Sequence, residues 1–297
     1  MSDNKSERII VGVDGSTASD AAIRWAAGEA AMRKVDLTLL HVVNPVPGLG
    51  VGYSMAPLPA DFGRLQEEEA QRVLESARRV VKAAIPPGGN IDVHSELVIA
   101  NPVPTLIDVS KDAQMIVVGC RGYGAWRRGL FGSISTGLVH HAHCPVAVIH
   151  DPADGGPTGR RGPVVLGVDG SPASELAIAI AFGEACSRGV ELVAIHAWLD
   201  TEPSYISRST WPDFEAQAAE VLSERLSGWS DRYPDVVVNR RVVLNQPARH
   251  LLEAAESAQL VVVGSHGRGG FAGMVLGSVS TAVVHAARTP VIVARRG

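Results

Sequence analysis

The chain contains two copies of one pattern, and this repeat restricts the folds that it can adopt. The segment IIVGVDGS at residues 9–16 returns as VVLGVDGS at 164–171, which is 155 residues later. The segment MIVVGCRG at 115–122 returns as LVVVGSHG at 260–267, which is 145 residues later. A period of this length far exceeds the roughly 20–50 residues of solenoid and propeller repeats, so each copy predicts a complete domain.

The length of 297 residues agrees with two domains of ordinary size. We expect domain 1 at residues 1–150 and domain 2 at residues 164–297. The segment between them, DPADGGPTGRRGP at 151–163, has the composition of a linker. The second offset is smaller than the first, so the first copy is longer, and the Pro- and Gly-rich residues 44–63 are expected to form its additional loop.

Composition excludes several classes of protein. Hydrophobic residues make up 46% of the chain, which disfavours a largely disordered protein. The net charge of −4 offers no basic excess for a nucleic-acid backbone, so we expect no nucleic-acid partner. No apolar run approaches the roughly 18 residues of a membrane span, and the polar N-terminus lacks a signal-peptide pattern. With three widely spaced cysteines and no disulfide framework, the expected location is the cytoplasm, away from membranes.

Strand and helix patterns alternate along each copy. In the first copy, apolar segments predict strands at 9–13, 37–43, 91–98, 115–119 and 146–149. Helical patterns lie between them, ending near Arg33 for the first and then covering 61–84, 104–113 and 133–142. Parallel neighbours need crossover connections, so this order predicts an α/β fold. The expected architecture is two tandem Rossmann-like, doubly wound parallel-sheet domains.

Glycine-rich turns follow the first and fourth predicted strands of each copy. In the first copy, Gly12-Val13-Asp14-Gly15-Ser16 follows one strand and Gly119-Cys120-Arg121-Gly122 follows the other. Gly132-Ser133 then opens a helix. Ligands of open parallel sheets bind beyond the carboxyl ends of the strands. Glycines allow close backbone approach and a helix start presents free N–H groups, so the pattern predicts a phosphate-binding cradle in each copy.

These residues resemble a known family. The spacing Gly-x2-Gly-x9-Gly-Ser occurs at 119–133 and again at 264–278, together with Val-Asp-Gly-Ser after the first strand and Leu-x-His-Val near the end of the second. In this combination the chain resembles tandem-domain members of the universal stress protein family, of the actinobacterial type. The resemblance covers nearly the whole chain, once in each copy.

The resemblance implies an adenine-nucleotide site in each domain, with ATP as the ligand, alone or with Mg²⁺. The implied binding residues of domain 1 are Gly12, Asp14, Val42, Gly119, Cys120, Arg121, Gly122, Gly124, Arg128, Gly132, Ser133, Ile134 and Ser135. Those of domain 2 are Gly167, Asp169, Ala197, Asp200, Gly264, Ser265, His266, Gly267, Arg268, Gly270, Gly277, Ser278, Val279 and Ser280.

The resemblance also implies roles for these positions. Asp14 and Asp169 lie at the edge of the nucleoside pocket, and the backbones of Val42 and Ala197 meet the adenine edge. The glycines and serines hold phosphate and ribose, and Asp200 reaches a ribose hydroxyl. Family members commonly carry Ser-His-Gly-Arg or Ser-His-Gly-Lys in this loop, and domain 2 has Ser-His-Gly-Arg at 265–268. Domain 1 departs with Cys-Arg-Gly-Tyr at 120–123, so its cation is expected from Arg121, Arg127 or Arg128.

Some of these residues have a structural interpretation. Asp14 and Asp169 are also suited to capping the following helices. His41 and His196 lie within apolar strands, where we expect hydrogen-bonded core histidines. The run His140-His141-Ala142-His143-Cys144 suggests metal ligands, but only its first histidine recurs, as His285, so we expect no metal site. Cys120, which matches Ser265, is expected to be a small filler and not a redox group.

The chain lacks any recognisable nucleophile–base constellation, so we expect nucleotide binding, not catalysis, in a regulator of stress or growth. Two alternatives remain: a slow ATP-hydrolysing or nucleotidyl-transfer enzyme, and a nucleotide-free interaction module. The residues do not distinguish ATP from AMP or cyclic AMP, and they do not identify the regulatory protein partner.

The last strands of the two copies, 146–149 and 291–294, are placed to pair with each other. In the resembling family the corresponding strands mediate dimerisation. We therefore expect a pseudo-dimer within one chain and association of two chains into a homodimer.

Overall fold

The computed structural model describes residues 8–45, 61–85, 89–122, 132–150, 161–198, 211–267 and 276–295. These residues form two compact units. The first unit comprises the chain up to Leu138 together with Ala142–Cys144. The second comprises Val139–His141 together with the chain from Pro145 onward.

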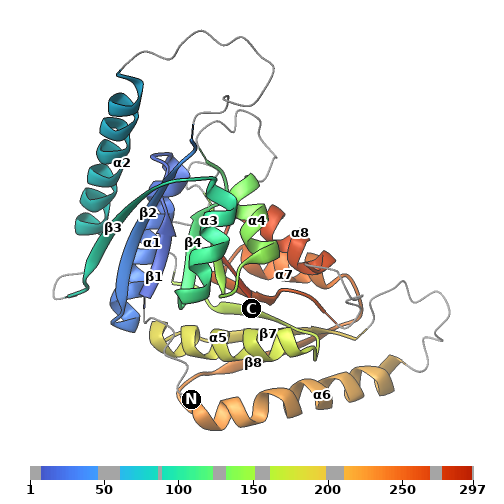
Figure 1. Cartoon of the computed structure of the whole chain (residues 1–297). Helices are drawn as coiled ribbons and strands as arrows, with labels where there is room; N and C mark the ends of the chain where they lie inside the picture. Colours follow the sequence, from blue (N-terminus) through green and yellow to red (C-terminus); the bar gives the residue numbers. More distant parts are fainter. Residues whose placement is uncertain are drawn as a thin grey trace, which may run out of the picture. The chain divides into compact units, whose positions relative to one another are not determined.

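The first unit is a four-stranded parallel sheet with helices. Its strands are β1 (Arg8–Gly12), β2 (Asp36–Val43), β3 (Val93–Ile99) and β4 (Met115–Gly119), in the order β3-β2-β1-β4. Its helices are α1 (Thr17–Arg33), α2 (Phe62–Ala84), α3 (Pro102–Val109) and the first part of α4 (Ser133–His141), and a 3₁₀ turn (Ser110–Asp112) follows α3. Figure 1 labels these elements along the chain.

The second unit repeats this arrangement and adds two strands, β5 and β10. Its strands are β5 (Val146–Ile149), β6 (Val164–Val168), β7 (Leu192–Ala197), β8 (Val238–Val243), β9 (Leu260–Gly264) and β10 (Val291–Ala294). Their order is β5-β10-β9-β6-β7-β8. Its helices are α5 (Pro172–Arg188), α6 (Trp211–Arg232), α7 (Pro247–Ala255) and α8 (Ser278–Ala286).

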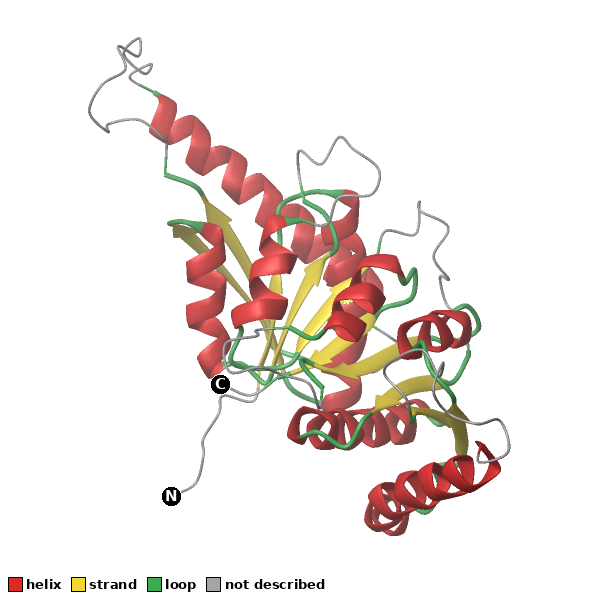
Figure 2. Cartoon of the chain, turned by 90° about the vertical axis from the view of Figure 1, so that its right-hand side faces the viewer, coloured by secondary structure: helices red, strands yellow, loops and turns green. Residues whose placement is uncertain are grey.

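The predicted α/β class is confirmed, and burial explains it. The central strands are apolar on both faces; Ile9, Ile10 and Val11 of β1, for example, are all at most 1% exposed. Strands of this kind need helices on both faces of their sheet. Figure 2 shows the yellow strands between red helices. No described helix is long and apolar enough to cross a membrane.

Local signals set the ends of the first helix in each unit. The Ser16 side chain caps α1 by accepting from the backbone N–H of Ser19, and Ser171 caps α5 in the same way. Gly189 ends α5 in the left-handed conformation that glycine adopts without strain.

The topology brings the two glycine-rich turns of each unit together. In the first unit the chain runs outward from β1 through β2 to β3 and then returns to β4 on the other side of β1. In the second unit β6 and β9 have the same relationship. The carboxyl ends of β1 and β4, and of β6 and β9, are therefore the switch points at which open sheets bind ligands.

The expected pairing of the last strands is confirmed. Within the second unit β5 and β10 are antiparallel, with Ala147 opposite Ile292. One predicted helix has different bounds: α3 begins at Pro102 and ends at Val109, whereas the sequence pattern suggests 104–113. Proline is well accommodated at the first position of a helix, so α3 starts earlier than the pattern indicates.

Candidate functional site

The turn after β1 holds the Asp14 carboxylate in a fixed position. Asp14 Oδ1 accepts hydrogen bonds from the backbone N–H and the hydroxyl of Ser16, at 3.0 and 2.6 Å. The backbone N–H of Asp14 donates to Ser19 Oγ at 3.2 Å. Gly15 has φ of 79°, a left-handed conformation that favours glycine. The turn therefore places an ordered carboxylate beyond the carboxyl end of β1.

The turn after β4 lies directly against this carboxylate. A Cβ atom at Gly122 would lie 2.6 Å from Asp14 Oδ2, closer than real contacts allow. A Cβ atom at Gly119 would lie 2.8 Å from the backbone carbon of Ala18 in α1. Glycine at both positions thus lets the two turns meet.

The start of α4 closes this group of turns. The backbone N–H of Gly132 donates to the Cys120 carbonyl at 3.0 Å, and Ser135 Oγ donates to the same carbonyl at 3.2 Å. Gly132 is the N-cap residue of α4 and supplies no side-chain cap. The first-turn N–H groups, those of Ser133, Ile134 and Ser135, have no partner within an α-helix, so they are suited to an anion.

The second unit builds the same arrangement. Asp169 Oδ1 accepts from the backbone N–H of Ser171 at 2.9 Å, and Gly170 has φ of 82°. A Cβ atom at Gly267 would clash with Asp169 Oδ2, as at Gly122 in the first unit. The backbone N–H of Gly277, the N-cap of α8, donates to the Ser265 carbonyl at 2.8 Å.

Residues at the start of α8 and in β6 complete this second set. Ser280 Oγ donates to the Gly264 carbonyl at 2.5 Å. The next N–H groups of α8 belong to Ser278 and Val279.

Gly12 of β1 and Gly167 of β6 lie one residue before the ends of their apolar runs. The side chain of Leu106 faces Gly12, and that of Leu251 faces Gly167. The structure thus brings most described candidate residues together twice.

The two sets differ in the hydrogen bond made by the serine that follows the Asp-Gly pair. In the first unit the Ser16 hydroxyl donates to Asp14. In the second unit the Ser171 hydroxyl donates instead to the backbone carbonyl of His266, at 3.1 Å. Ser265 Oγ lies 2.9 Å from His266 Nδ1. The loop after β9 is therefore connected to the turn after β6 by a hydrogen bond that the first unit replaces with a local one.

Val42 and Ala197 lie where their strands extend past the neighbouring strand. The register of β1 with β2 ends at Gly12 opposite Leu40, and that of β6 with β7 ends at Val168 opposite His196. Val42 and Ala197 therefore lie beyond the last residue pairs of these two ladders, near the Asp turns. Backbone groups in such a position are suited to hydrogen bonding with a base.

The interpretation of the strand histidines as core residues is confirmed. His41 Nδ1 lies 2.6 Å from the Val13 carbonyl, and His196 Nδ1 lies 2.7 Å from the Val168 carbonyl. Each ring fixes the backbone just before an Asp turn. These histidines therefore help to position the turn.

Some candidate residues lie outside the described part of the chain, namely Gly124, Arg127, Arg128, Asp200, Arg268 and Gly270. The same holds for most of the expected linker and for most of the loop at 44–63. Among the described residues, no group of three or more His, Cys, Asp or Glu side chains could hold a metal ion. Cys120 and Cys144 are both buried.

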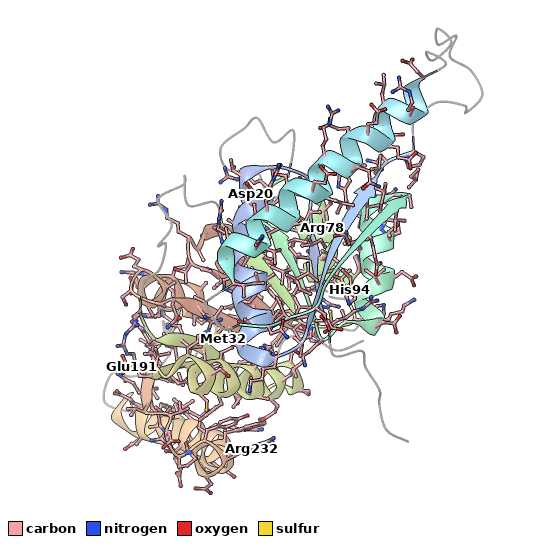
Figure 3. The ribbon with its side chains drawn as sticks, turned by 90° about the vertical axis from the view of Figure 1, so that its left-hand side faces the viewer. Asp20, Met32, Arg78, His94, Glu191 and Arg232 are labelled. Carbon is pink, nitrogen blue, oxygen red and sulfur yellow. The ribbon has the colours of Figure 1, made fainter. Side chains whose placement is uncertain are left out.

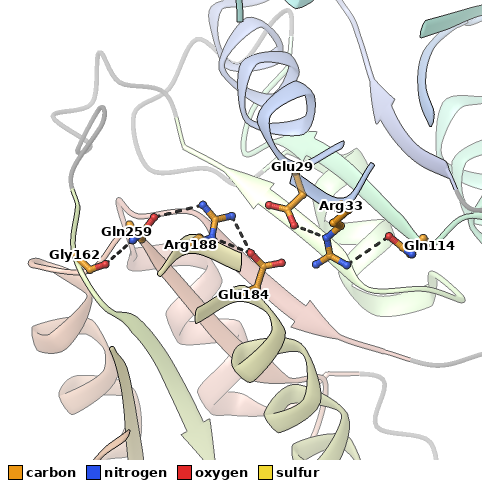
Figure 4. Close-up of polar contacts among 7 residues, drawn as sticks. All are labelled: Glu29, Arg33, Gln114, Gly162, Glu184, Arg188 and Gln259. Carbon is orange, nitrogen blue, oxygen red and sulfur yellow. Dashed lines mark hydrogen bonds and ion pairs between the residues drawn. The ribbon is translucent and has the colours of Figure 1, made fainter. Parts of the chain in front are cut away.

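Each unit contains a buried ion pair that was not predicted from the sequence (Figure 4). Glu29 lies 2% exposed in α1 and pairs with Arg33, which also donates to Gln114. In the second unit Glu184 lies 1% exposed in α5 and pairs with Arg188 at 2.9 Å, and Arg188 donates to Gln259. The sequence contains a signal for these pairs, because the Glu, the Arg and the Gln of the first unit all recur in the second at the offsets of the repeat.

Comparison with known proteins gives one consistent family. The model of the universal stress protein family matches residues 5–150 and 161–295. Universal stress protein Rv2623 of Mycobacterium tuberculosis is 51% identical over 294 residues, covering 99% of this chain and 98% of that protein. Universal stress protein Rv2005c of the same organism is 50% identical over 292 residues, covering 98% of each.

The comparison with solved structures supports the fold through the match with a TM-score of 0.71. A universal stress protein from Archaeoglobus fulgidus matches 99% of this chain and 100% of its own, with a TM-score of 0.71 and 23% identity. A universal stress protein crystallised in complex with cAMP matches 50% of this chain, with a TM-score of 0.37 and 22% identity.

Proposed function

We propose, from the premise that the chain belongs to the universal stress protein family and carries its domain twice, that each domain binds one adenine nucleotide. ATP is the proposed ligand, with its phosphates at the start of α4 or α8 and its adenine beside the backbone of Val42 or Ala197. Asp14 and Asp169 face the nucleoside. Nucleotide occupancy then controls a regulatory protein partner in stress or growth.

One observation carries this proposal. In both units a glycine of the second turn contacts the Asp carboxylate so closely that any side chain would fill the space, and a helix with a glycine N-cap starts beside it. The pair of turns is thus a cradle that only a backbone can form. Free helix N–H groups next to such a cradle favour a phosphate.

The hydrogen bonds of the Asp side chains suit a binding role. Asp14 Oδ1 accepts two hydrogen bonds from Ser16, and Asp169 Oδ1 accepts one from Ser171. These bonds hold each carboxylate in one orientation, in which it can recognise a ligand.

The test begins with purified protein that is denatured, so that released nucleotide can be identified by chromatography and mass spectrometry. Calorimetry of nucleotide-free protein with ATP, AMP and cyclic AMP then gives affinity and stoichiometry. We expect two sites per chain that prefer ATP. The proposal is wrong if no adenine nucleotide is released and none binds below the millimolar range. Multiple-turnover ATP consumption would replace it by the enzyme interpretation.

A further inference from the structure

A groove of about 600 Å³ lies on the first unit at the end of the sheet opposite to the candidate nucleotide site. Arg8 and Asp36, which line it, begin β1 and β2, whereas the Asp14 turn follows the carboxyl end of β1. His94 of β3 and Arg78 of α2 complete the wall, and Figure 3 labels both. Parallel strands separate their two ends by their full length, so this groove is distinct from the nucleotide site.

The charged groups of the groove are unequally paired. Arg8 Nη1 contacts Glu96 Oε1 at 3.2 Å, which balances those two charges. Arg78 Nε donates to the uncharged Ser95 hydroxyl at 2.8 Å, and within the described residues its guanidinium contacts no carboxylate. Asp36 lies 3.8 Å from His94, which is charged only when protonated. Among the described residues, the groove therefore holds a guanidinium, that of Arg78, with no carboxylate partner, and a carboxylate, that of Asp36, whose charged neighbour is a histidine.

The second repeat forms the same strands without these residues. At the positions of Arg8, Asp36, His94 and Glu96 it carries Pro163, Glu191, Asn239 and Arg241. The register of the strands is nevertheless the same, with Thr38 opposite His94 in one unit and Val193 opposite Asn239 in the other. The fold thus does not require Arg8, His94 and Glu96 at these positions, whereas the carboxylate of Asp36 is kept as Glu191.

We propose that this groove binds a small zwitterion that carries an α-ammonium and a carboxylate group, either a free amino acid or a short peptide. The carboxylate is bound by the two remaining nitrogens of Arg78, whose planar fork matches two oxygens. The ammonium is bound by Asp36. A simple anion is repelled by Asp36 and Glu96 and a simple cation by the two arginines, so a ligand with both charges is favoured.

The dimensions and the edge of the sheet suit such a ligand. The volume lies within the range of roughly 300–1,000 Å³ that is usual for small-molecule sites. Among the described strands of the first unit, β3 pairs with β2 alone, so its outer edge keeps free backbone groups. A peptide can use these groups in addition to Arg78 and Asp36.

The test follows the backbone amide signals of Val93–Glu96 by NMR in the full-length protein. Each of the twenty amino acids is added in turn, then triglycine and trialanine. We expect saturable shifts with at least one of these probes, and the responding class identifies the source of the ligand. An N-acetylated, C-amidated amino acid, which lacks both charges, is expected to cause none. The proposal is overturned if no amino acid and neither peptide produces a saturable shift.

Matched variants test the two charged groups. Arg78→Gln and Asp36→Asn are each expected to weaken binding about tenfold or more, as for a lost charge-assisted hydrogen bond. Arg79→Gln and Asp92→Asn change exposed neighbours that do not line the groove, and they are expected to leave the affinity unchanged. Equal losses in both sets would contradict the proposal. The ATP-induced melting shift, measured on every variant, reports the nucleotide site separately.

Discussion

At the scale of single residues, two glycines shape the candidate nucleotide sites. Gly122 and Gly267 approach the Asp carboxylates so closely that no other residue fits without a shift. Some other glycines have open space around them. Gly28, within α1, has no atom within 4 Å of its Cβ position. The geometry thus separates glycines that shape the site from those that do not.

We expect Gly122→Ala and Gly267→Ala each to abolish or weaken nucleotide binding in their own domain, by about tenfold or more. The new methyl group must displace the Asp carboxylate or the turn that faces it. Calorimetric stoichiometry before and after each substitution measures the loss. Gly28→Ala serves as the control, because it should retain both sites and stabilise α1 by about 0.5–1 kcal/mol. Unaltered binding in both site variants would contradict the proposed cradle.

A second prediction concerns a buried hydroxyl. Thr38 is fully buried in β2, and its hydroxyl finds no hydrogen-bond partner in the part of the chain that the structure describes. The second repeat has Val193 at this position. Thr38→Val should therefore raise the free energy of unfolding by about 1 kcal/mol, as measured by denaturant titration.

The contrasting variant for this experiment is Ser110→Ala in the same unit. Ser110 is also fully buried, but its hydroxyl donates to the Ile107 carbonyl and accepts from the backbone N–H of His143. Its removal leaves both groups unpaired and should lower stability. If the two substitutions changed stability in the same direction, hydrogen bonding would not explain the difference.

At the scale of helices and strands, the sequence predicted the repeated strands and glycine-rich turns, but it did not predict the buried ion pairs or the groove. Periodicity and turn residues identified every strand of the first copy, and the two glycine-rich turns identified the candidate site. The ion pairs of Glu29 and Glu184 were missed although their residue types recur at the offsets of the repeat, because helix spacing alone does not show which face becomes buried. The groove around Arg78 was also missed, since its residues come from four separate elements and most of them do not recur in the second copy.

The buried ion pair of α5 allows a prediction about helix side-chain pairs. Glu184 and Arg188 are 1% and 13% exposed, whereas Arg249 and Glu253 of α7, with the same i,i+4 spacing, are 68% and 53% exposed. Removing one member of a buried pair leaves a charge in a low-dielectric environment. A double-mutant cycle with Arg188→Met and Glu184→Leu should give a coupling of about 1–3 kcal/mol.

The same cycle on Arg249 and Glu253 is the control, with an expected coupling of about 0.5 kcal/mol or less. Both cycles are measured by denaturant unfolding in identical buffer. A coupling in α5 no greater than that in α7 would show that burial does not strengthen the pair.

We expect the stability of the protein to depend on pH through His140, which lies in the last turn of α4. Burial, followed by the charges of His141, Arg295 and His285, lowers the pKa of His140 below its usual 6.5. Between 6.5 and this lower value the unfolded chain binds more protons than the folded one. The stability contributed by neutral His140 is thus complete above pH 6.5 and is lost as pH falls through that window. Denaturant unfolding across pH 5–7.5 should show this loss, and His140→Gln should reduce it; an unchanged slope would exclude His140 as its source.

At the scale of the whole molecule, the strand that ends the first sequence copy completes the sheet of the second unit. β5 covers the outer edge of β10, whose residues Val291, Ile292 and Val293 are fully buried. A chain of residues 161–297 lacks β5 and exposes this apolar edge, which is free to pair with another copy of itself. A chain of residues 145–297 retains β5. Sedimentation velocity should therefore show stronger concentration-dependent association for the shorter chain than for the longer one. Equal behaviour of the two would mean that β5 does not protect β10.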